Sequence, residues 1–128
     1  MTIARFYLKD ENVMQRGNWI PPVDIYETEA HDLVVKAELP DMTREDIEVT
    51  VEKDTLTIRG TKKLPDGIKD EQLRRIERSY GAFSRSFALP HTVDSTKVSA
   101  DYKNGVLTVK LPYREEAKPR TINVEVAA

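Results

Sequence analysis

The sequence of 128 residues contains no cysteine, only five glycines, and nearly equal numbers of acidic and basic residues. The absence of cysteine excludes disulfides, thiolate nucleophiles and thiolate metal sites. The glycines stand singly, so there is no glycine-rich loop to cradle a phosphate. A formal charge of −2, from 20 basic and 22 acidic residues, gives no electrostatic reason to expect nucleic acid or an anionic membrane as a partner.

Long hydrophobic runs are also missing. The longest aliphatic run is Leu33-Val34-Val35, so we expect neither a transmembrane helix nor a signal-peptide core. A composition of 39% hydrophobic and 33% charged residues is typical of a folded domain and argues against wholesale disorder. The length fits one domain, and we expect it to act in a reducing compartment, the cytoplasm.

No apparatus for catalysis is visible in the sequence. His31 and His91 both stand in polar turns, without the spacing of a metal site, and we interpret them as solvated residues. No nucleophile motif such as G-x-S-x-G occurs. Carboxylate pairs such as Glu115-Glu116 lie in predicted loops, where nothing suggests a raised pKa. We therefore predict a protein that is not an enzyme and has no cofactor and no metal.

The sequence does contain a period of two, from Val23 to Leu111, interrupted by turn signals at short intervals. This alternation predicts about seven strands and an all-β, immunoglobulin-like antiparallel β-sandwich. Between strands, Thr43 followed by Asp46 predicts a single capped helical turn, in which the threonine hydroxyl accepts the free amides.

Two hairpins can be predicted with their registers. Two-residue turns at Lys53-Asp54 and Asn104-Gly105 place every apolar residue of the flanking strands on one face, and Asn-Gly is the strongest short hairpin signal. A slip by one residue would bury polar side chains instead. The predicted pairs are Val51 with Leu56, Val49 with Ile58, Tyr102 with Leu107, Ala100 with Val109 and Val98 with Leu111.

Three segments lie outside this regular pattern. We divide the chain into an N-terminal arm (residues 1–20), a sandwich (21–112) with a long polar loop (61–72), and a C-terminal tail (113–128). The arm is rich in large apolar residues outside the sandwich: Phe6, Tyr7, Leu8, Met14 and Trp19.

The tail carries a short apolar alternation behind a charged linker that contains proline. An extended Ile122-Asn123-Val124 segment places its two aliphatic side chains on one side, about 6.6 Å apart. That geometry suits two neighbouring pockets along a sheet edge. The alternative is that both chain ends fold back onto their own sheet.

Four segments together resemble the small heat shock proteins, the α-crystallin domain family. Residues 98–109 resemble its A-x-x-x-n-G-V-L hairpin signature, and residues 39–47 its L-P-G-[FM]-x-x-E-D-I segment, with Asp41 in place of the common glycine. Residues 77–90 resemble its R-x-x-G-x-F-x-R-x-F-x-L-P strand, and Ile122-Asn123-Val124 its C-terminal I-x-I/V motif. Because the 61–72 loop is long, the resemblance is to the bacterial and plant type.

The resemblance implies an ATP-independent holdase of the stress response. Such chaperones form dimers that assemble into larger homo-oligomers and bind unfolding client proteins. The client-binding candidates are the apolar residues of the arm, Phe6, Tyr7, Leu8, Met14 and Trp19. In the bacterial and plant type a strand of the long loop swaps onto the partner, which here implies residues near Ile68 pairing with Val23, Ile25 and Tyr26. Arg85 matches an arginine near that dimer interface, although an ordinary solvent-facing role is the alternative.

The resemblance also implies a groove for the tail motif. Its anchors are Ile122 and Val124, and the implied groove is lined by Ile47, Val49, Val51, Val98 and Ala100. A monomeric β-sandwich adaptor that assists another chaperone, similar to CS domains, is the competing function. Such adaptors lack the tail motif and the G-V-L hairpin signature, so Ile122-Asn123-Val124 argues against it.

Overall fold

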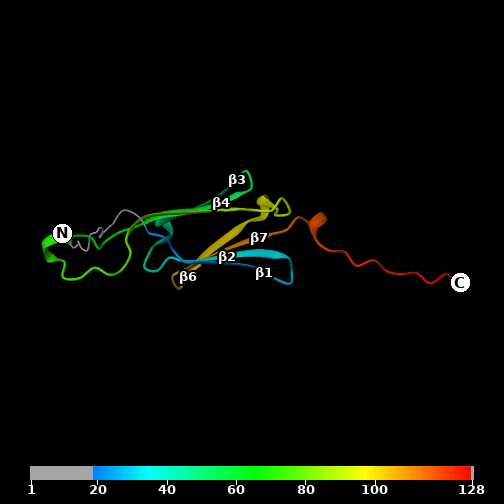
Figure 1. Ribbon diagram of the computed structural model, residues 1–128, viewed down its shortest axis with the longest axis horizontal. Helices are drawn as coiled ribbons and strands as arrows, with labels where there is room; N and C mark the ends of the chain where they lie inside the picture. The colour runs from blue at the N-terminus through cyan, green and yellow to red at the C-terminus, as the bar shows by residue number, and fades with distance from the viewer. Residues whose placement is uncertain (1–18, 128) are drawn as a thin grey trace.

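A computed structural model describes residues 19–127, which form two antiparallel sheets packed face to face (Figure 1). One sheet has the order β1-β2-β7-β6 and the other β3-β4-β5. The strands of this described region are β1 Val23–Glu27, β2 Asp32–Glu38, β3 Ile47–Glu52, β4 Thr55–Lys62, β5 Gly81–Ala88, β6 Ser99–Lys103 and β7 Val106–Pro112. The predicted all-β sandwich is therefore confirmed.

The core lies between the two sheets and is supplied by alternate residues of the strands. In β4, for example, Leu56 and Ile58 are buried while the next residue outward, Arg59, is exposed. This alternation gives each sheet one apolar face, which is what two stacked sheets need. The buried cluster consists of Val35, Ala37, Leu39, Leu56, Ile58, Phe83, Leu89, Val93, Leu107, Val109 and Leu111.

Both predicted hairpins form in the predicted registers. Val49 pairs with Ile58 and Val51 with Leu56, and both turn residues Lys53 and Asp54 have positive φ. In the second hairpin, Tyr102 pairs with Leu107, Ala100 with Val109, and the Asn104-Gly105 turn again has positive φ at both positions. The predicted pair of Val98 with Leu111 is not part of the ladder. β6 begins one residue later, because Val98 ends the short 3₁₀ turn η3 (Ser95–Lys97).

The helical turn predicted after Thr43 is present as η1 (Arg44–Asp46), and Thr43 and Asp46 form a capping box at its start. The hydroxyl and the amide of Thr43 both donate to the carboxylate of Asp46, at 3.0 and 3.2 Å. These two donors, which favour the charged carboxylate, hold the pKa of Asp46 below its usual value.

The connection from β4 to β5 extends away from the sandwich (Figure 1). β4 runs through Lys62, so the connection covers residues 63–80, starting two residues later than the predicted loop. It contains the 3₁₀ turn η2 (Asp70–Gln72) and no strand. Among residues 19–127, no helical segment has the length or the hydrophobicity needed to cross a lipid bilayer.

Candidate protein-interaction site

An open groove lies where the edges of the two sheets meet. β3 is an edge strand of the three-stranded sheet and β6 is an edge strand of the four-stranded sheet. Because side chains alternate along a strand, Ile47, Val49 and Val51 of β3 all face inward and are half-buried. The hollow between the two edges has a volume of about 540 Å³ and is lined by Arg44, Ile47, Val49, Ala100, Asp101, Tyr102 and Leu107.

The groove unites three of the five residues that were predicted to line it, namely Ile47, Val49 and Ala100. Val51 and Val98 are half-buried against the core and do not line the hollow. Sequence reasoning did not select Tyr102 or Leu107. Both were visible as a predicted hairpin pair, and the alternation of β6 puts Tyr102 on the same face as Ala100.

Tyr102 fixes the geometry at one end of the groove. Its hydroxyl donates to the carbonyl of Leu39 and accepts the backbone N–H of Met42 at 3.3 Å. Both partners lie in the connection from β2 to η1, 60 and 63 residues before Tyr102 in the sequence. One side chain therefore joins β6 to the segment that leads into β3. The two walls of the groove are therefore held at a fixed separation.

The C-terminal tail leaves this body and does not fill its own groove. After the 3₁₀ turn η4 (Glu115–Ala117), the chain runs without a strand and points away from the sandwich (Figure 1). The side chain of Ile122 is 75% exposed and that of Val124 is 88% exposed. Within one chain, an apolar tail and an apolar groove are therefore both left open, and the alternative that the tail folds back onto its own sheet is not what the structure shows.

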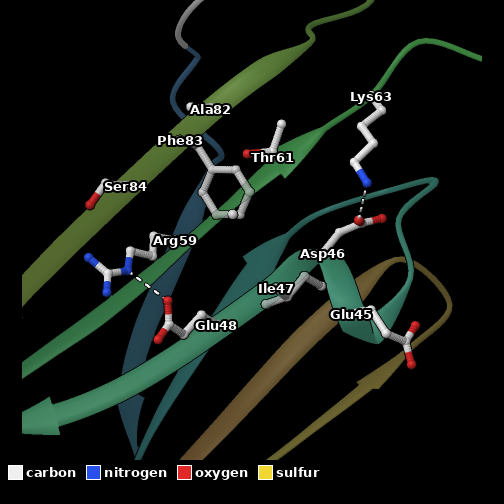
Figure 2. Close-up of a pocket in the computed structure, with 11 residues that line it drawn as sticks. Glu45, Asp46, Ile47, Glu48, Arg59, Thr61, Lys63, Ala82, Phe83 and Ser84 are labelled. Atoms are coloured by element: carbon white, nitrogen blue, oxygen red, sulfur yellow. Dashed lines mark hydrogen bonds and ion pairs between the residues drawn. The ribbon is translucent and has the colours of Figure 1, made fainter.

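A second hollow of about 590 Å³ lies beside the groove, at the start of β3 (Figure 2). Four of its charged residues form ion pairs with one another: Arg59 donates to Glu48 at 2.8 Å, and Lys63 lies 3.5 Å from Asp46. Five of its eleven lining residues are charged, against two of seven in the groove, so it is a weaker candidate than the groove for docking an apolar segment.

The residues predicted for a dimer interface lie on exposed elements. β1 is the outer strand of its sheet, and Ile25 and Tyr26 are 46% and 44% exposed. Ile68, in the projecting connection, is 46% exposed. Val23 is half-buried.

Arg85 faces the inner side of β5, in phase with Phe83 and Phe87, rather than the solvent. Its guanidinium lies 5.1 Å from the centre of the Phe87 ring and donates to the carbonyl of Pro21 at 2.8 Å. Arg85 is half-buried, and its visible partner is the segment that leads into β1; its place near a dimer interface stays a prediction.

Of the client-binding candidates, only Trp19 belongs to the described residues. It is half-buried and packs against the core. Phe6, Tyr7, Leu8 and Met14 lie outside the described residues.

The two histidines lie in separate pairs. His31 contacts Glu27 at 3.2 Å and His91 contacts Asp54 at 2.7 Å. Within residues 19–127, no three His, Cys, Asp or Glu side chains converge in a way that would hold a metal ion.

Comparison with known proteins identifies a family and several relatives with similar sequences. The sequence profile of the Hsp20/alpha crystallin family matches residues 25–126. The chain is 42% identical over 107 residues to spore protein SP21 of Stigmatella aurantiaca, covering 83% of this chain and 62% of that protein. It is 46% identical over 100 residues to the 17.8 kDa class I heat shock protein of Arabidopsis thaliana, covering 77% of this chain and 62% of the relative. The chain thus spans less than two thirds of the length of these relatives.

Solved structures share the fold. A small heat-shock protein from Xylella fastidiosa matches with a TM-score of 0.71 and 40% identity, covering 84% of this chain and 98% of that one. HspA from Xanthomonas axonopodis matches with a TM-score of 0.67 and 42% identity, covering 75% of this chain and 95% of the other. At these identities, the likeness extends to sequence as well as to fold.

Proposed function

Because this chain belongs to the Hsp20/alpha crystallin family of small heat shock proteins, whose members are non-enzymatic chaperones, we propose that it is an ATP-independent holdase of the cytoplasm. It binds partly unfolded proteins before they aggregate, and it works as a dimer that assembles into a larger homo-oligomer. The observation that carries this proposal is the exposed tail of Ile122 and Val124 together with the open groove between β3 and β6.

The assembly contact joins the tail of one chain to the groove of another. Ile122 and Val124 lie on one side of an extended segment, and Ile47 and Val49 have the same spacing of two residues along β3. Adding such a segment to a sheet edge uses backbone hydrogen bonds for affinity and side-chain pockets for specificity. Burying about 100–200 Å² of apolar surface contributes roughly 2–5 kcal/mol before the costs of ordering.

A contact of that size is weak when taken singly, yet several of them hold an oligomer together by avidity. Weak contacts also exchange, so that heating opens apolar surface without unfolding the sandwich. A holdase needs this combination, because permanently exposed apolar patches lead to irreversible self-association.

The dimer contact that we propose uses the edge of β1 and the projecting connection of the partner. β1 has a free edge with Ile25 and Tyr26 exposed, and Ile68 is exposed on a segment that extends away from its own sandwich. An exposed strand edge is a template for pairing with another chain. In this arrangement residues near Ile68 add to β1, and Arg85 supports the neighbouring segment through Pro21.

Client proteins are bound by the apolar residues of the N-terminal arm, in which Phe6, Tyr7, Leu8 and Met14 supply large apolar side chains. This part of the proposal rests on the sequence alone. An unfolding chain offers the same kind of apolar surface, and it competes for the contacts that the arm makes within the oligomer.

The test combines native mass with a turbidity assay. We expect particles heavier than the 14.7 kDa chain, and suppression of the heat-induced turbidity of citrate synthase with no nucleotide present. Added ATP leaves the suppression unchanged, and an equal mass of an inert protein such as albumin gives the baseline. A monomer that leaves the turbidity unaltered contradicts the proposal, and a monomer that binds a second chaperone supports the adaptor function instead.

A further inference from the structure

Trp19 occupies a defined site at one end of the sandwich. Its indole N–H donates to the carbonyl of Gly81 at 3.0 Å, and its backbone N–H donates to the carbonyl of Ala82 at 3.3 Å. Both acceptors stand at the start of β5, an edge strand of its sheet. The residue is thus held by backbone groups of a strand that begins 62 residues later in the sequence.

The ring of Trp19 also contacts two side chains, those of Phe83 and Lys62. The ring of Phe83 meets it edge to face, with 5.3 Å between the centroids and an interplanar angle of 62°. The ammonium of Lys62 lies 5.3 Å from the centre of the indole. Edge-to-face aromatic pairs and cation–π contacts are favourable, and the second is stronger where the cation is shielded from water.

Lys62 is shielded in this way. Its side chain points inward from the end of β4 and is only 5% exposed, and this burial lowers its pKa. The ring of Tyr80 lies 6.0 Å from the same ammonium. Arg78 bonds the hydroxyl of Tyr80 at 3.2 Å and the carboxylate of Asp41 at 2.9 Å, so the far wall of the site is braced.

Trp19 and the two residues that follow it are held by different contacts. Ile20 is 76% exposed and contributes little to the fold, whereas Pro21 is buried and its carbonyl is held by Arg85. Pro21 therefore holds the chain to the sandwich independently of Trp19, which lies two residues before it. The two hydrogen bonds and the ring contacts of Trp19 lie outside the ladder of β1, which begins at Val23.

We propose that this end of the sandwich is a binding site for aromatic residues of unfolding polypeptides, and that Trp19 is its built-in competitor. Each contact that Trp19 makes is one that an extended chain with an exposed tryptophan reproduces: a backbone N–H, an indole N–H, and a ring between Phe83 and Lys62. This inference rests on the proposed holdase function, and it names a client chemistry and a second place for client contact, on the sandwich rather than in the arm.

The experiment uses the full chain with the substitution Trp19→Ala, which empties the site. The ligand is a dye-labelled peptide with the sequence of residues 16–22, Arg-Gly-Asn-Trp-Ile-Pro-Pro, and binding is followed by fluorescence anisotropy at 25 °C. We expect it to bind Trp19→Ala at least about tenfold more tightly than the wild-type chain, in which the competitor is present. A peptide with alanine in place of tryptophan is the matched control, and the double variant Trp19→Ala with Lys62→Met is expected to bind more weakly than Trp19→Ala.

A folded Trp19→Ala protein, as judged by circular dichroism, that does not prefer the tryptophan peptide overturns the inference. The wild-type chain supplies a second measurement that does not depend on any variant. Trp19 is its only tryptophan, so acrylamide quenching of its emission reports whether the site is occupied. The client for this measurement is reduced, unfolded α-lactalbumin in which each tryptophan is replaced by tyrosine, so that Trp19 is the only indole while the client keeps aromatic rings. At saturation this client should increase the quenching of Trp19, and unchanged or decreased quenching contradicts the inference. If Trp19→Ala still suppresses turbidity while the peptide fails to bind, the proposed function stands and this site alone is refuted.

Discussion

Replacing both Ile122 and Val124 with alanine tests the assembly contact most directly. The double substitution removes five methyl or methylene carbons, which at about 0.8 kcal/mol for each fully buried carbon lowers the docking free energy by about 4 kcal/mol. That loss reduces the affinity of each contact by roughly a factor of a thousand. Both side chains are largely exposed in the single chain, so the change leaves the sandwich intact.

The expected result is a shift of the particles towards dimers, measured by light scattering after size-exclusion chromatography. The thermal unfolding of the sandwich should remain close to that of the wild type. Asn123→Ala is the matched control, because the side chain between the two anchors points away from the groove in an extended segment. It should leave the mass almost unchanged.

An unchanged mass for the double variant would refute the reasoning about the tail. A decrease in mass that is equally large for Asn123→Ala would also refute it, because the effect would then not depend on the two apolar anchors. The complementary change in the groove, Val49→Asp, places a charge where the tail docks. It should reproduce the loss of assembly.

Three further changes test other parts of the structure. Deleting residues 64–70 should give monomers by light scattering, because it removes the segment proposed to reach the partner, and a persisting dimer would exclude that exchange. Gly60→Ala should lower the free energy of unfolding by about 1–3 kcal/mol in chemical denaturation, because the new methyl group would lie 2.1 Å from the carbonyl oxygen of Asp46, and an unaltered stability would contradict this packing. The hydrogen bond from Arg78 lowers the pKa of Asp41, so this pair stabilises the fold above the unfolded value of 3.8 and the contribution is lost as the pH falls through the lower folded pKa. The melting temperature of Asp41→Asn should accordingly depend less on pH below about 4 than that of the wild type, and equal slopes would count against the pair.

The hairpins show how much of the fold is local. The register of each hairpin is set at the Lys53-Asp54 or Asn104-Gly105 turn, because only one alignment puts all the apolar residues on one face. The turn residues and the apolar residues that decide this alignment lie within about ten residues of one another in the sequence. For the same reason the β-sandwich class could be predicted from alternation and turn spacing. The predicted pair of Val98 with Leu111 does not form, because the η3 turn before Val98 decides where β6 starts.

What the sequence by itself determined is therefore the set of strands, the face that each strand buries, and the motifs of the tail and hairpin. Only the tertiary structure decided which side chains line the groove between the edges of β3 and β6, where Tyr102 and Leu107 take part and Val51 and Val98 do not. It also brought Trp19 against Lys62 and Phe83, and turned Arg85 inward to Pro21. The physical reason is that a period of two specifies which side of a strand is apolar, whereas the neighbour across the core depends on how the two sheets stack and on how the chain crosses between them.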